Sequence, residues 1–124
     1  IIKPSLNIKF SEIYIPDSTN WKNFEDSLTE LELLSNKYNF TIIFIIHPHL
    51  YNFEKYPLTE YHKRIKILAE REGFIVIDML AYYKDYDFNQ LKILKQDNVH
   101  PNYLGNQIIA NAVSNKIIEM NLLN

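Results

Sequence analysis

The sequence contains no cysteine and only two glycines among its 124 residues. The lack of cysteine excludes disulfide bonds, zinc–thiolate sites and a cysteine nucleophile. Glycine occurs only at Gly73 and Gly105, so no serine follows a glycine. The sharp glycine turn on which a nucleophilic serine is often presented is therefore missing.

The chain also lacks an excess of charge of either sign and any long apolar run. A net charge of -2 and a pI near 6.1 argue against nucleic acid as a partner. The longest apolar run, Ile42 to Ile46, is far shorter than the ~20 residues that span a bilayer. The composition, 47% hydrophobic and 23% charged, is that of one soluble globular domain, and no motif indicates a cellular compartment.

The apolar pattern predicts alternating helices and strands. Helix-capping residues around Ser18 precede a helical periodicity over residues 20–37. The unbroken apolar runs Phe40–Ile46 and Phe74–Ile77 predict strands covered on both faces. Between them, Pro57 begins a helix that Gly73 ends. The expected core residues are Trp21, Phe24, Leu28, Leu31, Ile65, Leu68, Ile108 and Ala112.

This layout predicts a three-layer α/β/α architecture with two adjacent parallel strands and helices on both faces. Two covered strands do not make a stable parallel sheet. We therefore expect either pairing with another copy of the chain or further strands in sequence that precedes Ile1. The segment Ile13-Tyr14-Ile15 is a short strand or an extended lead-in.

A tight turn over residues 97–101 carries the most distinctive chemistry. Pro101 disfavours helical dihedrals at His100, and a helix is predicted to begin near Asn102. A carboxylate at Asp97 could hold Nδ1 of His100 and leave Nε2 free for proton transfer. The alternative is that Asp97 only caps the turn and that His100 is an ordinary loop histidine.

The pattern D-x-x-H-P-N-x-x-G-x-x-x-x-A over residues 97–110 resembles the last motif block of the SGNH (GDSL-type) hydrolases. Weaker matches lie upstream, in the same order as in that family: Pro16 to Trp21, His47-Pro48-His49-Leu50, Tyr56-Pro57-Leu58 and Asp78-Met79-Leu80. The resemblance implies that residues 1–124 are the C-terminal portion of one flavodoxin-like domain whose N-terminal part is missing.

The same resemblance implies a serine esterase or acyl-ester hydrolase that needs no cofactor, with His100 as general base and Asp97 as its orienting carboxylate. We expect His47, Tyr51 and Asn102 to contact the substrate, which is an O-acylated carbohydrate or another small ester. Hydrolysis and acyl transfer to another acceptor both remain open.

The family's serine and oxyanion blocks have no counterpart here. The nearest imitation is Pro16-Asp17-Ser18, where proline replaces glycine and Ser18 is better explained as a helix cap. The nucleophile and the oxyanion donors are therefore expected upstream, and these 124 residues alone are expected to be inactive.

Two other classes of function are compatible with the sequence. A metal site could combine His47 and His49 with Asp97 and His100, whereas His62 has no partner at ligand spacing. Alternatively, the domain is a non-catalytic binding module. The aromatic loop over residues 81–96, with a helical turn near 87–91, either lines a ligand site or covers the flank of the core.

Overall fold

The computed structural model describes residues 15–123 and shows a mixed α/β chain. Ile13 and Tyr14 lie outside the described residues. The elements, in order, are α2 (Thr19–Tyr38), β1 (Ile43–Ile46), the 3-10 turn η1 (Phe53–Lys55), α3 (Thr59–Arg71), β2 (Ile75–Asp78), α4 (Leu80–Tyr83), the 3-10 turn η2 (Phe88–Leu91) and α5 (Tyr103–Glu119).

The predicted parallel pairing of the two strands is confirmed. β1 and β2 lie side by side in parallel, with Ile43 opposite Ile75 and Ile46 opposite Asp78. β1 is shorter than predicted, because Phe40 is exposed and precedes the strand. β2 is shifted by one residue, so that Asp78 ends the strand rather than following it.

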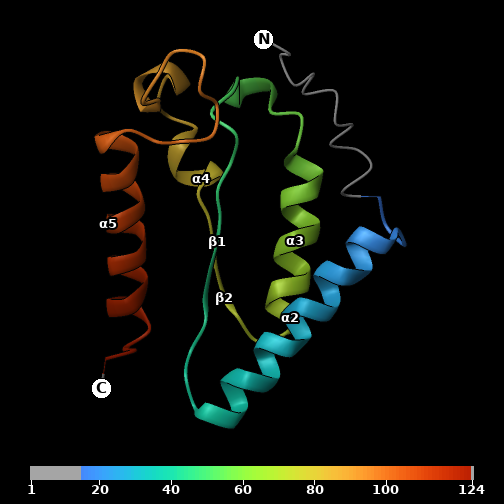
Figure 1. The fold of residues 1–124 in the computed structure, drawn as a ribbon. Helices are drawn as coiled ribbons and strands as arrows, with labels where there is room; N and C mark the ends of the chain where they lie inside the picture. Colours follow the sequence, from blue (N-terminus) through green and yellow to red (C-terminus); the bar gives the residue numbers. More distant parts are fainter. Residues whose placement is uncertain (1–14, 124) are drawn as a thin grey trace.

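Apolar side chains cover both faces of this pair. On one face, α2 and α3 pack on the sheet through a cluster that includes Leu68 and Phe74, with Phe44 beside it. On the other face, Ala112 of α5 belongs to a second cluster with Ile77. Successive strand residues point to opposite faces, so a strand that is covered on both faces needs an unbroken run of apolar residues. Figure 1 shows the strands between α5 on one side and α2 and α3 on the other.

α2 begins as the capping residues predict. The Oγ of Ser18 accepts a hydrogen bond from the Trp21 N–H at 3.1 Å, so Ser18 is the N-cap. Leu31, predicted in the core, is 41% exposed, and that prediction is wrong. Only Trp21 and Leu28 of α2 are buried, because the C-terminal half of the helix runs beyond α3 (Figure 1).

The junction before α5 is tightly built. Asn102 is the N-cap of α5 and accepts the Gly105 N–H at 3.1 Å. A Cβ at Gly105 would lie 2.6 Å from the Cβ of Pro101, closer than side chains approach. The Tyr83 hydroxyl donates to the Gly105 carbonyl at 3.0 Å and joins α4 to α5. Glycine is therefore required here by space, whereas Gly73, at a φ of 80°, ends α3 as predicted.

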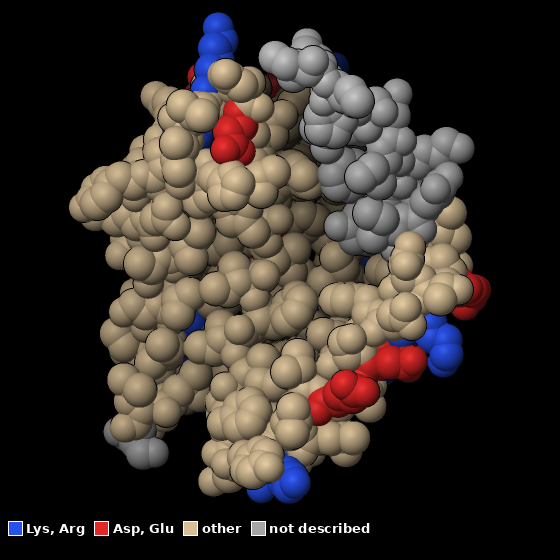
Figure 2. Space-filling model, in the orientation of Figure 1, with Lys and Arg blue, Asp and Glu red and all other residues tan. Residues whose placement is uncertain are grey.

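The sheet is open at its edges within the described part of the chain. β1 and β2 form a two-stranded sheet, so each has one edge without a strand neighbour. Figure 2 shows that the surface between α5 and α2 is almost free of charged side chains, which gather over α2 and at the opposite end of the view. None of the helices in residues 15–123 combines the length and the apolar character needed to cross a bilayer.

Two leucines of α2 provide a matched test of this packing. Leu28 is 3% exposed and Leu33 is 60% exposed. Leu28→Ala should lower the free energy of unfolding by about 2–5 kcal/mol, because it leaves a cavity between α2 and α3. Leu33→Ala should change it by less than about 0.5 kcal/mol. Urea denaturation measures both, and equal effects would contradict this placement of α2.

Candidate active site

The loops that follow both strands lie at one end of the molecule. The segments after β1 and β2 and the stretch that leads into α5 all gather there (Figure 1). This is the edge at which α/β proteins bind ligands, because the carboxyl ends of parallel strands meet there. His47 and His49 follow β1, and His100 precedes α5. His47 interacts electrostatically with His49, His62 and His100, and His49 interacts with His62.

The Asp97–His100 pair has the predicted geometry. Nδ1 of His100 lies 2.9 Å from Oδ2 of Asp97. The other carboxylate oxygen, Oδ1, accepts the backbone N–H groups of Val99 and His100 at 2.9 and 3.0 Å. The His100 side chain is 70% exposed, and no hydrogen bond to its Nε2 is found among the described residues.

These hydrogen bonds determine the protonation state of Asp97. The backbone N–H of His100 is the largest cause that lowers the pKa of Asp97, followed by the N–H of Val99, and the pKa falls to about 2. Asp97 is therefore ionised at neutral pH and can only accept hydrogen bonds. The proton between the two side chains must lie on Nδ1, which leaves Nε2 of a neutral His100 ring as a proton acceptor.

The turn is held from outside as well as from within. The Leu50 N–H donates to the Asn98 carbonyl at 2.8 Å, which ties the loop after β1 to the turn. The Lys92 ammonium donates to Oδ1 of Asn98 at 2.6 Å. The Ile93 N–H donates to the His100 carbonyl at 3.3 Å. The pair is thus anchored to the sheet edge as well as to α5.

The three residues expected to contact substrate have different surroundings. The Asn102 side chain is engaged within the chain: its Nδ2 donates to the carbonyls of Gln90 and Lys92, and its Oδ1 caps α5. Tyr51 is half-exposed, and its ring is tilted against that of Phe88 at 6.2 Å. These contacts show Asn102 as a support of the turn, and its contact with substrate stays a prediction.

His47 is half-buried beside Tyr83. Its Nε2 lies 3.5 Å from the Tyr83 hydroxyl, and the two rings meet edge to face. Burial is the main cause that lowers the pKa of His47, and the charges of His49, His62 and His100, in that order, lower it further. Burial also raises the pKa of Tyr83 to about 12, so the phenol keeps its proton. His47 is therefore a neutral ring within electrostatic reach of His100.

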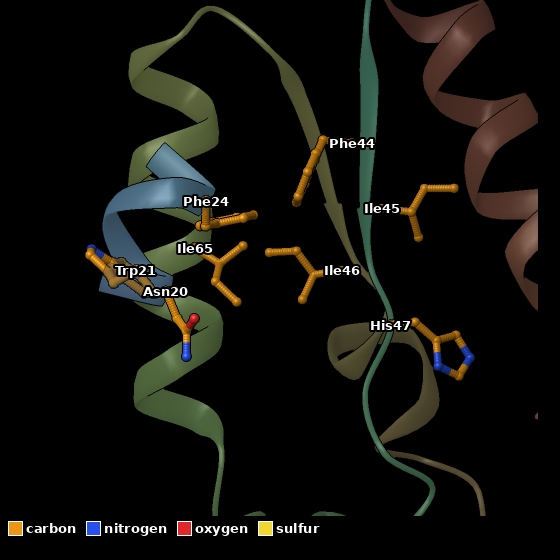
Figure 3. Close-up of a pocket in the computed structure, with 8 residues that line it drawn as sticks. All are labelled: Asn20, Trp21, Phe24, Phe44, Ile45, Ile46, His47 and Ile65. Atoms are coloured by element: carbon orange, nitrogen blue, oxygen red, sulfur yellow. The ribbon is translucent and has the colours of Figure 1, made fainter. Parts of the chain in front are cut away.

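An apolar cavity of about 350 Å³ lies on the other side of β1. In Figure 3 the side chains of Phe44 and Ile46 point toward Trp21 and Phe24, and those of Ile45 and His47 point the opposite way, toward α5. The cavity thus belongs to the interface between β1 and the helices. His47 borders it but presents its imidazole to the other face of the strand.

A second histidine–carboxylate pair was missed by sequence reasoning, which gave His62 no partner. Nδ1 of His62 lies 2.9 Å from Oδ1 of Asp78, and its Nε2 lies 3.3 Å from the Tyr56 hydroxyl. That hydroxyl accepts the His49 N–H at 2.9 Å. With a neutral ring, the hydrogen bonds run in one direction from His49 through Tyr56 and His62 to Asp78. The available signal was a polar residue on the buried face of α3 opposite a strand-end aspartate.

This chain of hydrogen bonds is buried, so its role is to stabilise the structure. His62 is 5% exposed and Tyr56 is 8% exposed, so neither ring faces solvent. These hydrogen bonds connect the end of β2, the start of α3 and the loop after β1. They thereby fix the loop whose Leu50 holds the 97–101 turn.

The metal hypothesis finds no support in the described part of the chain. Among residues 15–123, no group of three or more His, Cys, Asp or Glu side chains could hold a metal ion.

A small apolar cavity of about 330 Å³ adjoins the turn. It is lined by His49, Tyr51, Tyr56, Pro57, Leu58 and Asn98. Asn98 belongs to the turn itself, so the cavity borders the residue that follows Asp97. Its size is at the lower end of the range of small-molecule sites.

Comparison with known proteins gave no match to any family model, curated protein or solved structure. Function is therefore inferred from the geometry of the site.

The pKa of Asp97 can be tested directly. Carboxyl-carbon NMR should give Asp97 a midpoint at about pH 2, against 3.8 for an unperturbed aspartate, and Asp97→Asn should remove the signal. Because the folded-state pKa is depressed, the stability that ionised Asp97 contributes is present above about pH 4 and is lost as the pH falls toward 2. A midpoint near 4 would contradict the hydrogen bonds described for this carboxylate.

The buried chain of hydrogen bonds predicts a cost for Tyr56→Phe. The substitution keeps the ring but leaves the His49 N–H and His62 Nε2 without this partner, which should lower the free energy of unfolding by about 1–3 kcal/mol. Tyr103 is 82% exposed, so Tyr103→Phe is the matched control and should have no effect. Denaturation of both variants gives the comparison, and equal stability would show that the hydroxyl of Tyr56 is dispensable.

Proposed function

We propose that this chain is the C-terminal part of an SGNH-type serine esterase or acyl-ester hydrolase, with His100 as its general base and Asp97 as the carboxylate that orients it. The observation that supports the proposal most is the 2.9 Å contact between Nδ1 of His100 and an ionised Asp97. It leaves an exposed Nε2 at the carboxyl edge of a parallel sheet, which is the arrangement that base catalysis by histidine requires.

In the proposed reaction, Nε2 of His100 removes the proton from a serine hydroxyl as its oxygen attacks the ester carbonyl carbon. The carbonyl electron pair moves to oxygen and returns as the bond to the alcohol breaks, and His100 gives the proton to that alcohol. Water then attacks the acyl-enzyme with the same base and releases the acid and the serine. Asp97 keeps its negative charge throughout and stabilises the imidazolium that forms.

The serine would come from outside the described residues. Ser18 caps α2, and Ser27 and Ser35 donate to backbone carbonyl oxygens of nearby residues. No serine in residues 15–123 is hydrogen-bonded to His100. The proposal therefore places the nucleophile and the oxyanion donors in the preceding part of a larger domain.

The sheet supports the same extension. β1 lacks a strand neighbour on its outer edge, beside an apolar cavity and a surface almost without charges (Figure 2). In the proposed three-layer α/β/α domain, strands that precede this chain add to that edge. They would carry the serine to the same end of the sheet as His100.

His100→Ala in the full-length protein tests the proposal. Hydrolysis of p-nitrophenyl acetate should fall by about 10²–10⁴-fold in kcat, since the general base is lost. Asp97→Asn should reduce kcat by less, because the imidazole remains but loses its orienting carboxylate. The isolated 124-residue chain should hydrolyse the ester at the background rate.

Val99→Ala is the matched control. Val99 lies in the same turn with an exposed side chain, and its backbone N–H to Asp97 is kept in the variant. It should retain the parental kcat. Full activity in His100→Ala would overturn the assignment of the base.

A further inference from the structure

A cavity of about 690 Å³ at this end of the molecule has no role in the proposed chemistry. It lies between the segment that follows His49 and the loop between α4 and η2. Its walls combine aromatic rings with carboxylate and amide groups. This composition differs from that of the apolar cavity beside Asn98, and the two cavities share Tyr51 as a common wall.

The aromatic wall is rigidly supported. The Tyr51 ring lies 6.2 Å from that of Phe88, and Phe88 meets Phe53 edge to face at 6.2 Å. Phe53 in turn stacks on Tyr83, which is fully buried in the core. The rings thus form a continuous column from the core to the cavity, in which Tyr51 is 52% exposed. Tyr86 adds a second partly exposed ring, at 39%.

The polar groups of the cavity are mostly hydrogen-bond acceptors. Glu54, Asp85 and Asp87 supply carboxylates, against the single ammonium of Lys84. Asp87 binds both the backbone N–H and the Nδ2 of Asn89 through one oxygen, which fixes the Asn89 amide beside the cavity. Carboxylates accept several hydrogen bonds each, and they repel anionic ligands.

We infer that this cavity binds a sugar ring of a neutral carbohydrate. A sugar ring has an apolar face of C–H groups, which suits an exposed tyrosine, and a rim of hydroxyl donors, which suits carboxylate and amide oxygens. A purely apolar ligand would leave the carboxylates without partners. A phosphorylated ligand or a uronate would meet three negative charges.

The position of the cavity connects this inference to the ester chemistry. Tyr51 lines both cavities, and Asn98, which lines the smaller one, belongs to the turn over residues 97–101. Resting on the proposed function, the inference is that the carbohydrate is the alcohol part of the ester. A sugar unit held here lies away from the acyl group that reacts at His100.

Titration with uncharged oligosaccharides tests the inference. A panel of xylo-, cello-, manno- and chito-oligosaccharides is added to the protein, with binding followed by calorimetry and by the NMR signals of the tyrosine rings. At least one member should shift the signals of Tyr51 and Tyr86. Tyr51→Ala and Tyr86→Ala should each weaken that binding by about tenfold, because each removes one aromatic contact.

Tyr82→Ala is the matched control. Tyr82 is exposed to a similar degree on the neighbouring helix but does not line the cavity, so the variant should bind as the parent does. Oligogalacturonate should bind at least several-fold more weakly than the neutral ligand at low ionic strength, and added salt should reduce the difference.

The outcomes separate the two proposals. His100→Ala should retain oligosaccharide binding while losing ester hydrolysis, so each activity is measured without the other. No response to any neutral oligosaccharide, unchanged binding in both Tyr51→Ala and Tyr86→Ala, or equal binding of the uronate would overturn the inference. Retained hydrolysis in His100→Ala would overturn the catalytic proposal and leave the sugar site standing.

Discussion

The candidate site depends on the contact between the turn over residues 97–101 and the first turn of α5. Asn102 caps the helix with its side-chain oxygen and binds two carbonyls of the preceding segment with its amide nitrogen. The absence of a side chain at Gly105 allows Pro101 to lie directly against the helix. The position of His100 is therefore set by α5, and α5 is set by its packing on the sheet.

The loop after β1 supplies the second constraint on this turn. It is tied to α3 and to the end of β2 by the hydrogen bonds that pass from His49 through Tyr56 and His62 to Asp78. It holds the turn in its own right through the Leu50 N–H. Two polar networks, one exposed and one buried, thus meet in one loop. The exposed one carries the proposed chemistry, and the buried one stabilises the backbone on which it depends.

Local signals in the sequence were sufficient for the two strands, the three long helices and the Asp97–His100 pair, but not for α4 or η1. Ser18 caps α2 as expected, and α5 begins next to Asn102 as predicted. Both signals, like the effect of Pro101 on His100, act on neighbouring residues only. Predictions that depended on distant packing were less successful. The apolar periodicity of α2 continues through Leu31. It does not reveal that this half of α2 lies beyond α3 in space, where Leu31 is exposed. The pairing of His62 with Asp78 joins residues on different elements, and no local pattern encodes such a contact.

The close seating of Pro101 on Gly105 also bears on conformational entropy. A histidine in a free loop must lose backbone freedom when it engages a substrate, at a cost of about 1–2 kcal/mol for each residue that becomes ordered. Here that ordering is completed on folding, because the turn is continuous with a helix of 17 residues. Only rotations of the imidazole itself remain, and Asp97 already restricts them. Although its ring is exposed to solvent, His100 therefore meets an incoming ligand with little disorder left to lose.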